Sequence, residues 1–341
     1  MAQATTAGAS DIHLQKTDGT IQVSFRLDGV MTSAFELGPD VAERVFGRIK
    51  YLARLKTYQE SMPQEGRIEK SAIKAPTDLR VATYPTVTGE KIVLRLFATH
   101  SAQGLGELGF PEGAVLELEA FLRRNAGLLL LTGPAGSGKT TTIYACLRHL
   151  AGLGGCHIIT VEDPVEQFVP GVMQTEVNDA RGLTFAEATR HLLRQDPQTL
   201  VIGEIRDDQT ANLAVRAALT GHQVISTLHA GSCRGVFERL FVLCPDQHAV
   251  ISTVEMVVNQ RLLRRLCRGC GGAGCAACLQ TGYHGRAPMV EWVRVTDPLR
   301  LELRVRGPTA IEPKETLNAS ARHLWQSGVT NEAEYRRVAV A

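Results

Sequence analysis

The stretch GPAGSGKT occupies residues 133–140 and matches the pattern G-x-x-x-x-G-K-[ST]. Its glycines let the backbone turn tightly, so that successive N–H groups point into one cavity and can hold phosphate oxygens. In such a loop Lys139 reaches the β- and γ-phosphates of a nucleotide, and the hydroxyl of Thr140 holds Mg²⁺. The alternative is an ordinary glycine-rich turn, but chance produces this pattern in a chain of this length only about once in a hundred times.

The sequence on either side of the loop supplies the context that the pattern requires. Residues 127–131 form a short apolar run typical of a buried parallel strand, and residues 138–151 have apolar side chains at positions compatible with a helix. This order places phosphate at a helix N-terminus, where free N–H groups and the helix dipole favour an anion. The residues that we expect to hold the nucleotide are Gly133, Pro134, Ala135, Gly136, Ser137, Gly138, Lys139, Thr140 and Thr141.

The composition is that of a globular protein and indicates no particular partner. Of the 341 residues, 44% are hydrophobic and 21% are charged, and this length favours two domains. The net charge of +2 gives no reason to expect nucleic acid or an anionic membrane as a partner. Because neither a spanning helix nor a signal peptide can be recognised, we expect a cytoplasmic protein whose eight cysteines are reduced.

Residues 10–97 are expected to form a separate, mostly β module with one helix. The strong turn signal Asp18-Gly19 separates its first two strands. This half of the chain contains three arginines of interest, Arg67, Arg80 and Arg95. Taken alone, each arginine is as compatible with a structural role, on a solvated face or in a rim ion pair, as with a functional one. The predicted elements are strands at 10–17, 21–31, 78–84 and 91–97 and a helix at 40–56.

The second half alternates strands and helices, as a parallel sheet with crossover helices does. Acidic or histidine residues follow three of its strands, namely Glu162 with Asp163, then Glu204, then His229. Ligands of open α/β sheets bind at the carboxyl ends of the strands, so we expect these four residues to converge near the phosphate. The predicted strands are 157–161, 199–202 and 222–228, and the predicted helices are 184–195 and 208–220.

This convergence suggests ATP hydrolysis, which needs Mg²⁺, a residue that orients or deprotonates water, and positive charge for the transition state. Glu204 directly follows an apolar strand and is predicted to polarise the water. Glu162 and Asp163 are expected to add a second carboxylate through a Mg²⁺-bound water, and His229 to sense the γ-phosphate. The alternatives are a capping or turn role for the acidic pair and a structural role for the histidine.

Four motifs in this order resemble those of the type II secretion and type IV pilus assembly ATPases. GPAGSGKTTT (133–142) corresponds to Walker A, TVEDPVE (160–166) to the Asp box, RQDPQTLVIGEIRD (194–207) to Walker B and TGHQVISTLHA (220–230) to the His box. The resemblance runs from ASDIHLQ (9–15) to GVTNEAEYRRV (328–338). The chain departs from the family at Gln198, where Asp is usual, at STLHAG in place of STLHTN, and at Ser61-Met62, where a basic pair is common.

The resemblance implies an α/β fold with a RecA-like P-loop ATPase core, preceded by a smaller α+β, PAS-like N-terminal domain and followed by a small Cys-rich segment. It also implies a homohexamer whose ATP sites lie between the N-terminal module and the core, with Arg67 and Arg80 reaching the phosphates and Arg95 matching less closely. The predicted domains are the N-terminal domain at 1–98, a linker at 99–112, the ATPase core at 113–266, the tetracysteine segment at 267–292 and a helical region at 293–341.

By the same resemblance, the chain is a cytoplasmic motor that hydrolyses ATP to drive pseudopilus or pilus assembly. Its implied partner is an inner-membrane platform protein, with no nucleic acid and with the membrane reached only through partners. The family's far N-terminal docking domain has no counterpart here, so we expect a short member or a truncated chain.

Two CxxC pairs, Cys267-x-x-Cys270 and Cys275-x-x-Cys278, indicate a zinc site, because each pair can present two thiolates to one ion. Only four residues separate the pairs, and the family's loop is longer here. The alternative is a set of four unpaired thiols that remains after a loop deletion.

Three other functions stay open. A pilus retraction motor is disfavoured because the retraction members of the family lack the four cysteines. A RecA-like nucleic-acid motor would need a basic groove or stacking aromatics, whereas the chain is near neutral with 5% aromatic residues. A nucleotide-binding scaffold without hydrolysis is disfavoured by the intact Lys139, Thr140 and Glu204.

Overall fold

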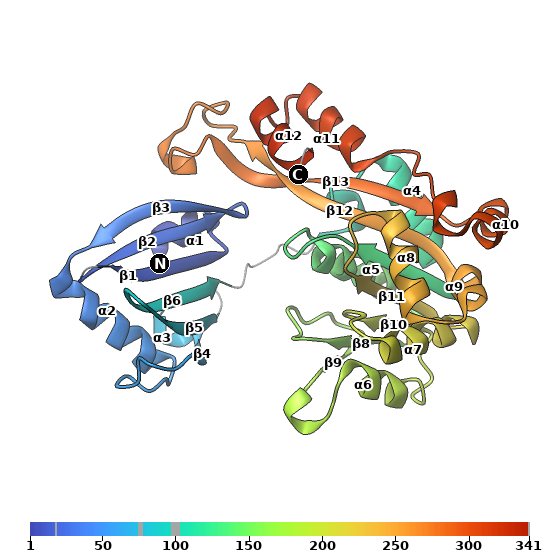
Figure 1. The fold of residues 1–341 in the computed structure, drawn as a ribbon, viewed down its shortest axis with the longest axis horizontal. Helices are drawn as coiled ribbons and strands as arrows, with labels where there is room; N and C mark the ends of the chain where they lie inside the picture. Colours follow the sequence, from blue (N-terminus) through green and yellow to red (C-terminus); the bar gives the residue numbers. More distant parts are fainter. Residues whose placement is uncertain (18, 74–77, 97–102, 340–341) are drawn as a thin grey trace. The chain divides into compact units, whose positions relative to one another are not determined.

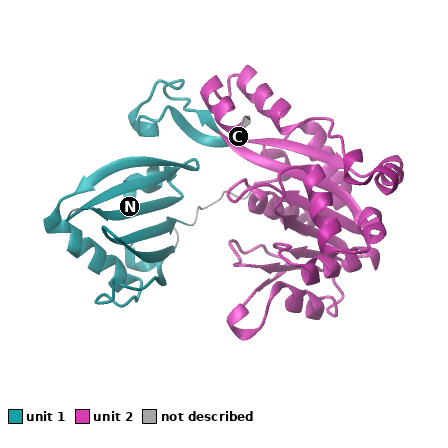
Figure 2. Cartoon of the chain, viewed as in Figure 1, with its two compact units in different colours: residues 1–101, 264–286 teal, residues 102–263, 287–341 magenta. Residues whose placement is uncertain are grey.

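The computed structural model describes residues 1–17, 19–73, 78–96 and 103–339, which form two compact units (Figures 1 and 2). Unit 1 comprises Met1–Ser101 and Arg264–Arg286, and unit 2 comprises Ala102–Leu263 and Ala287–Ala341. The segment with the four cysteines therefore groups with the N-terminal module, although its flanking strands continue into unit 2.

Unit 2 is organised around a seven-stranded sheet in the order β13-β12-β7-β11-β10-β8-β9 (Figure 1). The pairs β12–β7, β7–β11, β11–β10, β10–β8 and β8–β9 are all parallel. Its strands are β7 (Gly127–Thr132), β8 (Ile158–Glu162), β9 (Val172–Glu176), β10 (Thr199–Ile202), β11 (Gln223–Leu228), β12 (Val254–Leu266) and β13 (Tyr283–Arg294).

Helices cover both faces of this sheet, which is why its central strands are apolar throughout. Leu129 and Leu131 of β7 belong to a core with α4 (Glu112–Leu122) and α5 (Lys139–Leu153). Leu128 and Leu130 face the opposite core. That second core contains residues of α6 (Phe185–Leu192), α7 (Asp208–Leu219), α8 (Cys233–Leu243), α9 (Gln247–Thr253), α10 (Asp297–Arg306) and η4 (Gly307–Ala310). Near the C-terminus, α11 (Leu317–Gln326) and α12 (Glu332–Ala339) share a small core with β12 and β13. Elsewhere in unit 2, η1 (Leu105–Glu107) and η2 (Asp179–Arg181) are short 3₁₀ helices.

Unit 1 contains a six-stranded antiparallel sheet in the order β3-β2-β1-β6-β5-β4. One face packs against the helix α2 (Pro39–Leu52) through Ala42 and Phe46. Leu279, which follows η3 (Ala276–Cys278), also packs against this core, and the amide of Gly285 donates to Asp28 Oδ2 at 2.9 Å. The remaining elements are α1 (Ala2–Thr6), β1 (Asp11–Thr17), β2 (Thr20–Leu27), β3 (Val30–Leu37), β4 (Gln64–Ile68), α3 (Lys70–Ile73), β5 (Leu79–Thr86) and β6 (Gly89–Leu96).

The sequence-based strand at 21–31 is wrong in its length. Asp28 and Gly29 adopt φ values of 49° and 86°, so the chain turns there and β3 begins at Val30. Thr17 pairs with Thr20 as a tight hairpin requires, but Asp18 itself lies outside the described residues. Residues 97–102, which include part of the predicted linker, also lie outside them.

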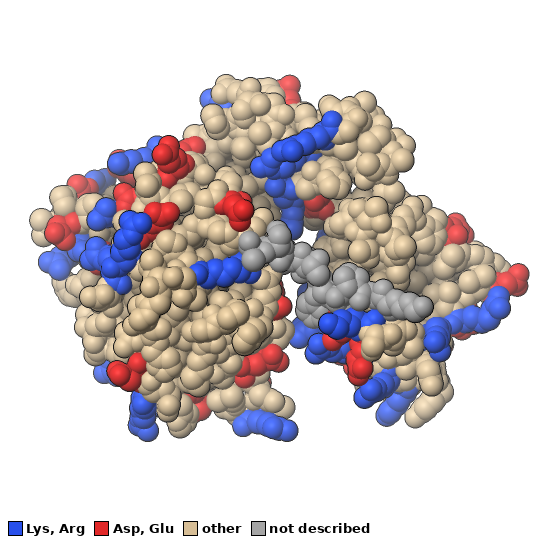
Figure 3. All heavy atoms as spheres, turned by 180° about the vertical axis from the view of Figure 1, so that it is seen from behind, with Lys and Arg blue, Asp and Glu red and all other residues tan. Residues whose placement is uncertain are grey.

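The surface is mixed in charge where Figure 3 shows it, because Lys and Arg side chains are interspersed with Asp and Glu on that face. Among the described residues, no helix has the length and apolarity needed to cross a bilayer.

Lys50 and Glu90 form a buried ion pair in unit 1, with Nζ 3.0 Å from Oε1 and both side chains at most 2% exposed. Lys50→Met would leave the Glu90 carboxylate buried without its partner, so we expect the free energy of unfolding in urea to fall by about 3–5 kcal/mol. Arg54→Met, which breaks the exposed pair with Glu69, should cost less than about 1 kcal/mol. Replacing both buried partners, as Lys50→Met with Glu90→Leu, should recover most of the loss, and equal costs for Lys50→Met and Arg54→Met would contradict this assignment.

Candidate nucleotide site

The loop between β7 and α5 has the shape that its glycines permit. Gly133, Gly136 and Gly138 have φ values of 132°, 73° and 92°, which side chains rarely adopt. A Cβ on Gly133 would lie 2.2 Å from the carbonyl oxygen of Gln260 in β12. The Gln260 amide also donates to Ser137 O at 2.9 Å and accepts from the Thr142 hydroxyl at 3.0 Å. The neighbouring strand therefore holds the loop in place.

Lys139 begins α5 and lies over its own loop. Its Nζ donates to the carbonyl oxygens of Gly133 and Pro134 at 2.8 and 2.9 Å. Burial lowers the pKa of Lys139, and the negative charge of Glu204 acts in the opposite direction. The hydroxyl of Ser137 is buried and has no hydrogen-bond partner within the described part of the chain. The loop thus has polar groups that a phosphate could satisfy, at the N-terminus of a helix.

A cavity of about 230 Å³ opens beside this loop at the carboxyl edge of the sheet. Its walls include Ala135 and Gly136 of the loop, whereas Gly133, Pro134, Ser137, Gly138 and Thr141 are not among its lining residues. The charged and polar residues predicted from the sequence that line it are Lys139, Thr140, Glu162, Asp163, Glu204 and His229. The structure therefore brings the residues at the carboxyl ends of β8, β10 and β11 to the phosphate-binding loop.

Glu204 is the centre of a charge network in the cavity. Its carboxylate lies 3.0 Å from His229 Nε2 and accepts from Arg206 Nε at 2.8 Å. Arg206 also reaches Asp163 Oδ2 at 3.3 Å. Arg206 was not predicted as a site residue. Its position two residues after Glu204, with the buried Ile205 between them, is the signal that could have identified it.

Glu162 differs from Asp163 in its surroundings. Asp163 is exposed, whereas Glu162 is buried and accepts hydrogen bonds from Thr160 at 2.6 Å, Gln174 at 3.0 Å and Tyr144 at 2.5 Å. Burial and the bond to Glu162 raise the pKa of Tyr144 well above its usual value, so the hydroxyl keeps its proton. Tyr144 lines the cavity but was not predicted; its i, i+4 spacing from Thr140 in the helix could have suggested it.

The three arginines of the N-terminal module form one row across its sheet. Arg67 pairs with Arg80, and Arg80 with Arg95, as direct cross-strand neighbours on β4, β5 and β6. Like charges at such positions are unfavourable unless they are compensated. Arg67 donates to Asp78, and Arg95 Nε donates to Asp11 Oδ1 at 2.9 Å. The row belongs to unit 1, and the cavity belongs to unit 2.

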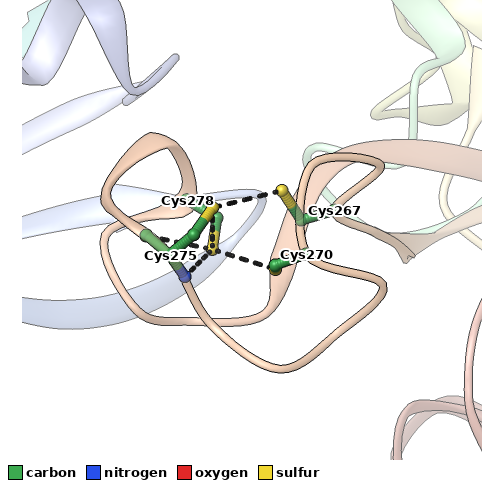
Figure 4. A group of neighbouring side chains, drawn as sticks. All are labelled: Cys267, Cys270, Cys275 and Cys278. Carbon is green, nitrogen blue, oxygen red and sulfur yellow. Dashed lines mark hydrogen bonds between the residues drawn. The ribbon is translucent and has the colours of Figure 1, made fainter.

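The four cysteines of the hairpin between β12 and β13 lie together (Figure 4). Their sulfur atoms all lie within 4.8 Å of one another. Cys267 and Cys275 are 3.9 Å apart, as are Cys270 and Cys278, and Cys275 and Cys278 are 3.7 Å apart. Four sulfurs at ~2.3 Å from one tetrahedral ion would be about 3.8 Å apart. The short spacing between the CxxC pairs therefore does not prevent both pairs from facing one point.

A mostly parallel sheet with a phosphate-binding loop after an inner strand, β7, and with acidic residues at the same edge, defines a P-loop nucleotide-binding fold. Residues 1–337 match the family described as Type II/IV secretion system protein, and the chain belongs to that family.

Individual relatives agree with this assignment. The chain is 40% identical over 309 residues to the type II secretion system protein HxcR of Pseudomonas aeruginosa, covering 88% of this chain and 66% of HxcR. It is 38% identical over 315 residues to the type IV pilus assembly ATPase TfpB of Acinetobacter baylyi, covering 84% of this chain and 54% of TfpB. The chain thus spans less than two thirds of the length of either relative.

Solved structures confirm the predicted fold class. The ATPase DotB of Legionella pneumophila superimposes with a TM-score of 0.75 over 99% of this chain and 93% of its own, and at 18% identity this likeness establishes the fold alone. The pilus retraction motor PilT with bound ADP has a TM-score of 0.68 and 25% identity, covering 98% of this chain and 94% of PilT.

The close approach of Gly133 to the Gln260 carbonyl oxygen leads to a prediction about stability. In Gly133→Ala the new Cβ would meet the Gln260 carbonyl at a φ unsuited to alanine, so we expect the free energy of unfolding to fall by about 2 kcal/mol or more. Gly152→Ala in α5, the helix that follows this loop, meets no atom within 4 Å and should be neutral or stabilise by up to about 1 kcal/mol. Urea unfolding of both variants checks this, and a Gly133→Ala protein as stable as the wild type would contradict the described loop.

Proposed function

We propose that this chain is an ATP hydrolase that works as a homohexamer to drive type II secretion pseudopilus or type IV pilus assembly. The observation that carries the proposal is the cavity in which Lys139 and Thr140 meet Glu162, Asp163, Glu204 and His229. Membership in the secretion family supports the biological role. An inner-membrane platform protein is the proposed partner, and the chain is proposed to act at the cytoplasmic face of that membrane.

In this proposal the phosphate-binding loop and Lys139 hold the β- and γ-phosphates, and Thr140 with nearby carboxylates holds Mg²⁺. The residues fit these groups, because the buried Ser137 hydroxyl lacks a partner in the described structure and Lys139 is positioned on the loop. Bound Mg²⁺ would neutralise charge that develops on the phosphate oxygens. Lys139 would exchange two neutral carbonyl acceptors for anionic phosphate oxygens, which form stronger hydrogen bonds.

Glu204 is proposed to orient and polarise the attacking water. It is the best candidate because it lines the cavity at the end of β10 and is only partly exposed, at 21% of its side chain. His229 Nε2 lies within hydrogen-bond reach of the Glu204 carboxylate. Contact of His229 with the γ-phosphate would therefore change its interaction with Glu204. Glu162, held by three hydrogen bonds, is proposed to act with Asp163 through a Mg²⁺-bound water.

Glu204→Gln tests the assignment of the water-polarising residue. We expect turnover of ATP to fall about a hundredfold or more, the scale of a lost general base, while the affinity for ADP is retained. Glu238→Gln, which alters an exposed carboxylate paired with Arg234 in α8, is the matched control and should keep the wild-type rate. A Glu204→Gln protein that hydrolyses ATP at the wild-type rate would remove Glu204 from the role.

Arg67 and Arg80 are proposed to supply positive charge to the nucleotide phosphates in the assembled hexamer. Family membership supports this role, and so does the cross-strand row, because directly opposed positions put the three arginine side chains beside one another on the same face of the sheet. Charge of this kind acts mainly in the transition state of phosphoryl transfer.

Arg80→Ala should therefore lower turnover at least ~tenfold while the affinity for ADP changes little. Activity per chain should also stop rising with protein concentration in the range where the wild type gains activity by assembling. Arg44→Ala, an exposed arginine of α2, is the control. An unchanged turnover number in Arg80→Ala would exclude a catalytic role for this arginine.

The four cysteines are proposed to bind one Zn²⁺ with a structural role. The sulfur–sulfur distances support a tetrahedral site, and a glycine-rich hairpin gains order from a metal. We expect about one zinc per chain in protein purified without chelator, and close to none in Cys275→Ser. Cys156→Ser changes an exposed cysteine outside the cluster and should keep the zinc. Wild-type protein without zinc, in which all four thiols react freely with a thiol reagent, would overturn the site.

A pilus retraction motor is the second candidate, favoured by the similarity to PilT. The chain is 40% and 38% identical to HxcR and TfpB but only 25% identical to PilT. This difference favours secretion or pilus assembly over retraction. Deletion of the gene in the native host distinguishes the two functions. A host that has lost an assembly motor forms no filaments, whereas a host that has lost a retraction motor forms filaments that do not shorten.

A further inference from the structure

Tyr144 lies in the second turn of α5, and its hydroxyl uses all of its hydrogen-bonding capacity. The O–H donates to Glu162 Oε2 at 2.5 Å, and the oxygen accepts from the backbone N–H groups of Glu166 and Gln167, both at 3.0 Å. One donor and two acceptor positions are the whole inventory of a phenol. Tyr144 is 1% exposed, so its hydroxyl depends on these protein groups for its hydrogen bonds.

The backbone that Tyr144 holds belongs to the loop after β8. This loop carries Asp163 and Glu166 to the wall of the cavity. Gln174 of β9 holds it from the other side, because its amide donates to Gln167 O at 2.9 Å and accepts from Val169 N at 2.7 Å. Phe168 lies between these attachments with 80% of its surface exposed, so it contributes little apolar packing to the loop. Val169, in contrast, is buried in the core that α4 and α5 share, so hydrogen bonds are the main restraint on the stretch between Asp163 and Phe168.

Thr140 and Tyr144 are four residues apart in the same helix and line the same cavity. One end of this helical turn is at the phosphate-binding loop, and the other end is bonded to the acidic loop. We infer that Tyr144 is a positioning residue, which fixes residues 163–169 against the phosphate-binding helix and so sets the place of Asp163 and Glu166 at the cavity. The inference rests on the proposed function for its catalytic consequence, but its structural content is independent of hydrolysis.

Tyr144→Phe removes only the hydroxyl oxygen. Two N–H groups then lack an acceptor and Glu162 loses one of its three donors, while the ring keeps its packing. We expect hydrogen–deuterium exchange of the amides of residues 166–167 to speed up at least ~tenfold, the scale of one hydrogen bond. We also expect kcat for ATP to fall at least ~tenfold while the Kd for ADP changes less than about twofold, since ADP is held by the loop at 133–140.

Tyr335→Phe is the matched control, because its hydroxyl donates to Asn318 Oδ1 at 2.7 Å in the C-terminal helices. It should change neither the exchange of residues 166–167 nor kcat. Gln174→Met is the second variant: it frees the same loop from the side of β9 and should reproduce both effects while Tyr144 is intact.

The exchange and kinetic measurements separate the possible failures. Unchanged exchange of residues 166–167 in both Tyr144→Phe and Gln174→Met would overturn the inference, as would a Tyr144→Phe protein that loses ADP affinity in proportion to kcat. Wild-type protein without ATP hydrolysis would contradict the proposed function, and the exchange result would still decide whether Tyr144 holds the loop.

Discussion

Where β7 ends, the chain passes so close to β12 that only glycine fits. The position of a Cβ on Gly133 is 2.2 Å from the carbonyl oxygen of Gln260, and the side chain of the same glutamine bonds Ser137 and Thr142. The phosphate-binding loop is thus held by the parallel neighbour of its own strand and is not shaped by its glycines alone. The position of Lys139 and Thr140, and the start of α5, follow from this contact.

The cavity beside the loop has its charges balanced by protein groups. Lys139 is satisfied by two carbonyl oxygens, and Glu204 is paired with both Arg206 and His229. In the proposed mechanism, a phosphate that draws Lys139, Arg206 or His229 toward itself would leave Glu204 freer to act on water. Arg206 connects this exchange to Asp163, and Tyr144 connects the helix to the loop on which Asp163 lies. Binding and positioning of the acidic groups are therefore parts of one hydrogen-bonded network.

The sequence was sufficient for the core of the fold because strand, loop and helix signals coincide around residues 133–140. The convergence of Glu162, Asp163, Glu204 and His229 was also predictable, since parallel strands bring their carboxyl ends to one edge. Arg206 and Tyr144 were missed because their importance depends on which groups they contact across the fold. The strands β12 and β13 were missed too, and the cross-strand alignment of the three arginines required a register that spacing in the sequence does not give.

The proposed hydrolysis of ATP in this cavity is tested most directly by measuring phosphate release from ATP by the purified wild-type chain with Mg²⁺. We expect steady release over many turnovers, which stops when Mg²⁺ is chelated and increases per chain as protein concentration rises. A chain that binds ADP and yet releases no phosphate above the background without protein, at any concentration at which it assembles, would contradict the proposed hydrolysis.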